Sequence, residues 1–349
     1  MLNNDGVVVR KLIETTRLRP VAAMLSHWRA RCALIALLVI VLIPTSVQAL
    51  QWAIVDQSLP NSVAAHSVRG FMAQVTKMSG GALNLAVQGV TANTSSAKSL
   101  SELSAGRLAV ASVPLAALEI ADPVVAMDRV PYLASNFVDG AKLWQVLGPY
   151  VRDTLQRQGI TLLYAVPLPP PSPLSRKPLM SMDAWRGSSV VLNAPALRGF
   201  ARAVGARGVA DAAPRVLLGA SRAEIVFQSA ALSVRDKAWQ YASDHLLAPA
   251  WFPKQLVLVS ARQLAALSAV DRDALLNAAD AARGQVWAAS ERATADAVQQ
   301  LRDYGIKTRE PPIGVLIELE SLGRDLLFQW SVAAGEVGAQ LVEAYYAIR

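Results

Sequence analysis

Residues 52–87 read WAIVDQSLPNSVAAHSVRGFMAQVTKMSGGALNLAV and carry the clearest alternation of secondary structure in the chain. Residues 52–55 predict a short strand, and the polar residues after them predict a turn. Apolar residues then recur at helical spacing until Gly80-Gly81 ends the helix. Leu83, Leu85 and Val87 alternate with other residues, which predicts a second strand with one apolar face. The stretch is therefore predicted to be strand, helix, strand.

The same order continues downstream. A Ser/Thr/Asn loop at residues 91–96 leads into a helix that ends near Gly106, and the apolar residues 108–113 predict a third strand. A β-α-β-α-β opening is typical of an open α/β sheet, whose ligand sites lie at the carboxyl ends of the strands. The fold class is therefore predicted to be α/β.

The middle of the chain alternates in the same way and contains one strong break. Residues 141–158 predict an amphipathic helix and residues 160–166 a strand. Prolines then crowd residues 167–173, a composition that predicts an extended connector and excludes both helix and central strand. Further elements are predicted beyond the break: a strand at 189–192, a helix at 196–204 and a strand at 256–260.

A long helix is predicted from Ser268, where Ser268 and Asp271 resemble a capping box, to Tyr304-Gly305. At 1.5 Å per residue it would be about 54 Å long, which is too long for one small domain. We therefore expect it to span two lobes. A last helical region is predicted at residues 317–346.

The N-terminus has the features of a secretory signal peptide. Arg29 and Arg31 precede the apolar run 32–43, and small residues lead to a Val-x-Ala site at Ala49. We expect cleavage after Ala49, with Met24 as an alternative start. The rival interpretation is an uncleaved anchor, which needs roughly 20 apolar residues. The mature protein is therefore expected in the periplasm.

Charge and cysteine content exclude several function classes. The chain carries a formal net charge of +8. Without residues 1–49 it keeps 28 basic and 24 acidic residues, and no basic cluster interleaved with aromatics is present. Nucleic-acid binding is therefore not expected. The single cysteine, Cys32, lies in the leader, so no disulfide or thiol chemistry is expected in the mature protein.

Catalytic chemistry finds no support in the residues. After position 49 the histidines are His66 and His245, and no nucleophile–base pair, metal motif or phosphate-cradling loop accompanies them. Asp271 and Asp273 open the long helix, where acidic residues suit the helix dipole. We expect no catalytic residues, no metal and no cofactor, and a secreted enzyme is the least favoured function.

Several motifs in register resemble the TRAP-transporter periplasmic solute-binding family of the DctP type. The resemblance covers the mature chain in order. The motifs are FMAQVTKMSGG (71–81), LSELSAGRLAVASV (100–113), DRVPYL (128–133), QGITLL (158–163) with RKPL (176–179), AVGA (203–206) and QLVLVS (255–260).

The resemblance implies a two-lobed periplasmic binding protein fold with mixed sheets and a long helix spanning both lobes. On that basis residues 50–168 plus about 253–285 are assigned to lobe I, and residues 169–252 plus about 286–349 to lobe II. It also implies capture of a small carboxylate and its delivery to the membrane subunits of a TRAP permease.

The binding residues depart from the family pattern. Val191 stands where the resemblance places a carboxylate-binding arginine, and a second arginine of some members falls within residues 170–172. Ala213 and Ala230 replace an aromatic residue and an asparagine of the family. The remaining polar candidates for ligand contact are Gln57, Ser95 or Ser96, Asn193 and Gln228.

Three interpretations of this pocket remain open. In the first, the pocket binds a less charged ligand through Gln57, Asn193 and Gln228. In the second, the scaffold persists but the pocket has lost its binding role. In the third, arginines at other positions bind the ligand. Arg198 and Arg202 are expected in solvent, while Arg176 and Lys177 are close enough to the connector to reach a cleft. A carboxylate beside Val191 without a cation would cost several kcal/mol, so tight binding of small dicarboxylates is not expected. A ligand-sensing or scaffold protein is the alternative to a transport receptor.

Overall fold

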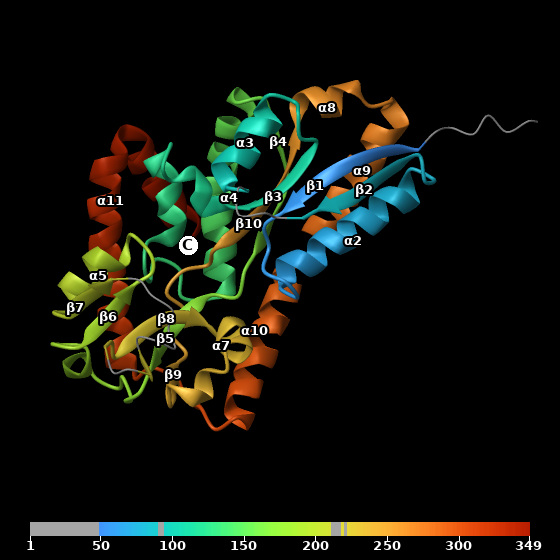
Figure 1. Ribbon diagram of the computed structural model, residues 1–349. Coiled ribbons are helices and arrows are strands. Elements are labelled where there is room, and N and C mark those ends of the chain that lie inside the picture. Colours follow the sequence, from blue (N-terminus) through green and yellow to red (C-terminus); the bar gives the residue numbers. More distant parts are fainter. Residues whose placement is uncertain (1–48, 90–93, 211–217, 220–221) are drawn as a thin grey trace, which may run out of the picture. The chain divides into compact units, whose positions relative to one another are not determined.

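Two mixed β-sheets organise the chain from Ala49 to Arg349 (Figure 1). The computed structural model describes residues 49–89, 94–210, 218–219 and 222–349. The predicted leader, up to residue 48, and Ala213 lie outside the described residues. The predicted fold class, α/β with mixed sheets, is confirmed.

The first sheet has the strand order β2-β1-β3-β10-β4. Strand β1 pairs in parallel with β2 and with β3, whereas β10 runs antiparallel to both β3 and β4. The bounds of these strands are β1 Leu50–Asp56, β2 Leu83–Gln88, β3 Val110–Pro114, β4 Ile160–Pro167 and β10 Lys254–Ser260.

The predicted β-α-β-α-β opening is confirmed. Helix α2 (Val63–Met78) follows β1, and helix α3 (Ser96–Ser104) lies between β2 and β3. Helix α2 ends because Gly80 and Gly81 adopt positive φ angles, which favour glycine. Helix α4 (Phe137–Arg157) begins one turn earlier than predicted, where Asn136 caps it.

The second sheet has the order β11-β9-β5-β8-β6-β7. Its strands are β5 Pro171–Ser175, β6 Ser189–Leu192, β7 Arg207–Ala210, β8 Ile225–Ser229, β9 Asp244–Leu246 and β11 Lys307–Arg309. Helices α5 (Leu197–Ala203) and α7 (Ala230–Arg235) belong to this part of the chain. The remaining short elements are the helix α8 (Ala261–Ala266) and the 3-10 turns η2 Leu115–Leu118, η3 Pro123–Arg129, η4 Met182–Ala184 and η5 Ala238–Gln240. The lobe boundaries stay a prediction.

The prediction that the proline run forms only a connector is wrong, because β5 is an inner strand of the second sheet. Pro171 and Pro173 both pair with β8, and the carbonyl oxygen of Pro171 accepts a hydrogen bond from Ala250 N (2.9 Å) on the other side. In an antiparallel ladder the N and O of one residue point to the same side. The nitrogens of both prolines therefore point away from β8, where the neighbouring β9 pairs only with Leu174 and Ser175.

The predicted single helix from residue 268 to 304 is two helices. Helix α9 (Ala269–Arg283) ends at Gly284, and α10 (Val286–Asp303) begins after Gln285. Helix α10 contacts α2 and β4 of the first part of the chain as well as α7 and β11 of the second. The contacts with both parts of the chain that were predicted for the whole helix are thus made by α10.

The last helix, α11, runs from Ile313 to Ile348 and confirms the helical region predicted at 317–346. Its backbone leaves helical geometry at Gly335, whose φ is 67°. It packs on α4, η3 and α5. No helix among the described residues is both long and apolar enough to cross a membrane.

The contact between α11 and the segment before α4 requires a glycine. A Cβ on Gly323 would lie 2.8 Å from the carbonyl carbon and oxygen of Tyr132, which are backbone atoms. We expect Gly323→Ala to lower the free energy of unfolding by about 1–3 kcal/mol, because α11 must shift to relieve the overlap. Urea denaturation measures this. Gly314→Ala is the matched control on the same helix, since its Cβ meets nothing within 4 Å; an equal loss at both positions would contradict the explanation.

Candidate functional site

The side chain of Gln57 follows β1 and joins it to the start of α3. Its Oε1 accepts a hydrogen bond from the Ser96 hydroxyl (2.6 Å), and its Nε2 donates to the Ser99 hydroxyl (3.1 Å). The backbone N–H of Gln57 donates to the carbonyl oxygen of Ser112 (3.0 Å). Both ends of the amide are therefore engaged within the protein.

Ser95 is the N-cap of α3. Its exposed side chain accepts a hydrogen bond from the backbone N–H of Lys98 (3.1 Å), as capping serines do. Gln57 and Ser95 thus lie at the same helix start, beside the carboxyl end of β1, and Ser96 is the residue that contacts Gln57.

A buried polar cluster that sequence reasoning missed lies next to Gln57. The Ser112 hydroxyl of β3 accepts a hydrogen bond from Gln255 Nε2 (3.1 Å) and shares one of 3.2 Å with the Ser58 hydroxyl. Ser112 and Gln255 are buried. The available signal was a polar residue, Ser112 or Gln255, beside the apolar run of each strand.

Val191 is a core residue of the second sheet. It is fully buried in an apolar cluster with Leu174 and Val226, and it pairs with Val209 of β7. The position at which the resemblance places an arginine therefore carries a side chain that packs rather than one that reaches a ligand. Ala230, the other substituted position within the described residues, is buried in the same cluster.

Gln228 of β8 is buried and only half satisfied. Its Nε2 donates to Asp236 Oδ2 (3.0 Å), while its Oε1 has no hydrogen-bond partner within the described part of the chain. A buried amide oxygen without a donor costs free energy, so it is a position that a ligand or water would satisfy.

Asn193 lies at the carboxyl end of β6 and lines a pocket of about 340 Å³. Its Nδ2 donates to the carbonyl oxygen of Phe227 in the middle of β8 (2.8 Å), which leaves its Oδ1 as an acceptor. The carboxyl end of a parallel strand is where ligands bind in open α/β sheets. The pocket is lined by Leu192, Asn193, Ala194, Pro195 and Arg198.

Arg198 supplies the positive charge of this pocket. It is exposed, as expected from the sequence, but its place in the pocket wall was not predicted. No ion pair of Arg198 with another described residue is found. Arg202, one turn further along α5, is also exposed and does not line the pocket.

The predicted site residues therefore fall into two groups. Gln57 and Ser95 lie at the start of α3, and Asn193 is linked through Phe227 to the strand that carries Gln228. Arg176 and Lys177 are exposed and line neither of the pockets described in this section.

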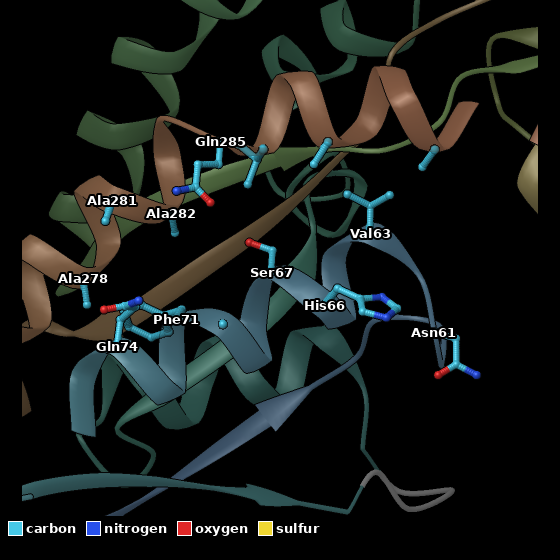
Figure 2. A pocket seen from close by; sticks show the side chains of 14 residues that line it. Asn61, Val63, His66, Ser67, Phe71, Gln74, Ala278, Ala281, Ala282 and Gln285 are labelled. Carbon is cyan, nitrogen blue, oxygen red and sulfur yellow. The ribbon is translucent and has the colours of Figure 1, made fainter. Parts of the chain in front are cut away.

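A second pocket of about 480 Å³ lies between α2 and the α9–α10 pair (Figure 2). Figure 2 shows Gln74 and Phe71 of α2 facing Ala278, while His66 and Asn61 lie toward the other end. Alanines of α9 and α10 form much of its wall, and none of its lining residues is an aspartate, glutamate, lysine or arginine. It therefore suits apolar contact more than recognition of an anion.

Three buried titratable groups line neither pocket, namely Lys254, Asp128 and His245. Lys254 Nζ contacts Asp128 Oδ1, and burial raises the pKa of the Asp128 carboxyl while the Lys254 ammonium opposes that rise. Burial lowers the pKa of the His245 imidazole to about 4. No cluster of metal-ligating side chains is found among the described residues.

Comparison with known proteins relates this chain to solved structures of solute receptors. No protein-family model matches the chain, and no curated protein matches it. Among solved structures, DctP7 of Bordetella pertussis, an extracytoplasmic solute receptor binding pyroglutamic acid, is 26% identical with a TM-score of 0.75; the match covers 85% of this chain and all of that one.

Two further structures extend the likeness. A marine-metagenome TRAP solute-binding protein specific for pyroglutamate is 23% identical over 86% of this chain and 100% of its own, with a TM-score of 0.74. A TRAP periplasmic solute-binding protein from Ochrobactrum anthropi is 16% identical over 87% and 97%, with a TM-score of 0.77. Over most of its length the chain therefore has the fold of DctP-type TRAP-transporter solute receptors, at the low sequence identity that a divergent relative would have.

Proposed function

We propose that this protein is a periplasmic receptor that captures a small organic acid and delivers it to the membrane subunits of a TRAP-type permease. The observation that carries the proposal is the pocket at the carboxyl end of β6, where Asn193 and Arg198 lie together on a solute-receptor fold. The predicted export signal supports the periplasmic location.

The pocket favours a solute with one carboxylate and a neighbouring N–H group. The Arg198 guanidinium can hold one carboxylate through a paired hydrogen bond. The free Oδ1 of Asn193 can accept from an amide N–H. Pyroglutamate has both groups, and DctP7, the 26% identical receptor, binds it. A second carboxylate would have no cation among the residues that line this pocket.

A thermal-shift comparison tests this assignment on the purified protein. Saturating pyroglutamate is expected to raise the melting temperature, since about a hundredfold excess over Kd adds about 2.7 kcal/mol. Succinate and malate are expected to produce no clear shift, because their second carboxylate stays unpaired. A shift with the dicarboxylates and none with pyroglutamate would overturn the assignment.

Arg198→Ala is expected to weaken binding of the monocarboxylate by about 10–100-fold, because a hydrogen bond to a charged group contributes about 1.5–3 kcal/mol. Isothermal titration calorimetry measures the change. Arg202→Ala is the matched control, because it removes the same charge from the same helix outside the pocket. Equal losses of affinity for both variants would show that Arg198 acts only through its long-range positive charge and not through contact with the ligand.

A sensing or scaffold role on the same fold is the second candidate. It is favoured by the engaged amide of Gln57 and the buried Val191, which leave few free polar groups at the predicted ligand contacts. Solute uptake in cells with and without the gene distinguishes the two roles. Loss of uptake supports the transport receptor, whereas unchanged uptake with an altered response to the solute supports a sensor.

A further inference from the structure

The solvent face of α11 carries a stripe of large apolar side chains. Ile313, Ile317, Phe328 and Val332 are 72%, 56%, 71% and 68% exposed. Single exposed apolar residues are ordinary, whereas several on one face of a helix indicate an interaction site. We call these four residues the α11 stripe.

Helical geometry places the four side chains on one face. At about 100° per residue they fall within an arc of about 100°, opposite Val315, Leu319 and Leu326, which are buried in the core. From Ile313 to Val332 the stripe is about 29 Å long, at 1.5 Å per residue. It ends just before the interruption at Gly335 and therefore lies on one helical segment.

The stripe is complementary to itself. When two copies of α11 lie antiparallel about a two-fold axis between residues 322 and 323, Ile313 comes level with Val332 of the second copy, and Ile317 with Phe328. Such an isologous arrangement uses the same patch twice and closes at two copies. Each apolar residue of the stripe is then level with another apolar residue.

One pair of charged residues on this face agrees with the same register. Arg324 is exposed on this face and Glu320 is partly exposed beside it. Neither forms an ion pair with another described residue. In the antiparallel arrangement Arg324 lies within about one residue's rise of Glu320 of the second copy, which by symmetry places two opposite-charge pairs across the interface.

We propose that the α11 stripe is a homodimer interface formed by two antiparallel copies of this helix. One helix face per copy is small compared with a standard interface of about 1,600 Å², so the dimer is expected to be a reversible one with a Kd in the micromolar range. This interface is separate from the strand-end pocket and does not depend on the proposed solute.

Sedimentation velocity of the whole protein at about 1–100 µM tests the proposal. A concentration-dependent dimer is expected for the native chain. Phe328→Glu should raise the Kd at least about 100-fold, because it sets a carboxylate against Ile317 of the second copy. The matched control is Ile120→Glu, at a side chain 96% exposed outside the stripe, which should leave the Kd unchanged. Circular dichroism confirms that both variants are folded.

Charge reversal tests the register. Arg324→Glu should weaken the dimer about 10-fold by placing two acidic groups together, and adding Glu320→Arg should restore it. A protein that stays monomeric at 100 µM overturns the proposal and leaves the stripe to a different partner. An equal effect of Ile120→Glu and Phe328→Glu overturns it too. Failure of the double reversal to restore the dimer overturns the antiparallel register.

Discussion

Lys254→Met is expected to lower the free energy of unfolding by about 3–5 kcal/mol, because it leaves a buried carboxylate without its cation. Lys254 and Asp128 are both almost wholly inaccessible to solvent. The Lys254 ammonium donates to Asp128 Oδ1 and to the carbonyl oxygen of Phe252 (2.7 Å), and it lies 5.6 Å from the ring centroid of Trp144. Methionine has a similar length but offers none of these donors.

The pair lies where the chain crosses between the two sheets. Lys254 opens β10 at the point where the chain returns from the second sheet to the first, and it pairs there with Pro167 at the end of β4. The neighbouring Leu168 N–H donates to the carbonyl oxygen of Pro253 (2.7 Å). The ion pair thus fixes one of the two crossing segments to η3, and backbone pairing joins that segment to the other.

A double-mutant cycle separates the loss of the pair from the loss of packing. The double variant Lys254→Met with Asp128→Leu should recover most of the stability lost by Lys254→Met, since replacing a whole buried pair by apolar residues is often neutral or stabilising. Guanidinium denaturation at pH 7 measures all four proteins. A double variant no more stable than the single one would mean that the buried charge of Asp128 is not the cause.

His245→Leu is expected to remove about 3 kcal/mol of the protein's sensitivity to acid. His245 lies in β9, between β5 and β11, and both of its ring nitrogens are buried without a hydrogen-bond partner within the described residues. Burial lowers the pKa of this imidazole from 6.5 to about 4. The folded protein therefore keeps His245 neutral where the unfolded chain protonates it.

The sign of the effect follows from proton linkage. Below pH 6.5 the unfolded chain binds a proton that the folded protein binds only near pH 4, so stability falls as the pH is lowered between these values. A difference of this size in pKa corresponds to about 3 kcal/mol, at 1.36 kcal/mol per unit. Above pH 6.5 this contribution to stability is fully present.

Urea denaturation at several pH values between 7 and 4 measures the effect as the difference between native and His245→Leu proteins. The difference in unfolding free energy should move in favour of the leucine variant by about 3 kcal/mol across this window. His66→Gln is the control, because His66 is exposed; its pH dependence should follow that of the native protein. Parallel curves for native and His245→Leu proteins would show that another group dominates the acid response.

Local patterns were sufficient for most elements of the first sheet. The strand at Trp52, the helix from Val63 and the stop at Gly80-Gly81 could all be predicted, because spacing and glycine act over a few residues. The prediction for the proline run was wrong because its structure depends on residues that are distant in the sequence. Whether Pro171 and Pro173 can occupy an inner strand depends on how far β9 extends beside them, and β9 lies more than 70 residues away in the sequence.

The prediction of one long helix was wrong because the helix is interrupted at Gly284 and Gln285. Apolar periodicity continues through residues 269–303, so nothing but Gly284 hinted at a break. The periodicity predicted how far the helical region extends. Whether that region is one helix or two depends on the packing of α9 and α10 on α2 and β4. Tertiary contacts therefore decide where such a helix bends.

The α/β class, the opening topology, the family resemblance and the valine at position 191, where that resemblance expects an arginine, could all be read from the sequence, since they depend on residue identity and local spacing. Three features needed the folded structure: the Gln57 amide is engaged by Ser96 and Ser99, Arg198 borders a pocket with Asn193, and Lys254 pairs with Asp128 from 126 residues away. Burial, hydrogen-bond partners and the loss of water around a charge depend on neighbours brought together by folding, and those neighbours are distant in the chain.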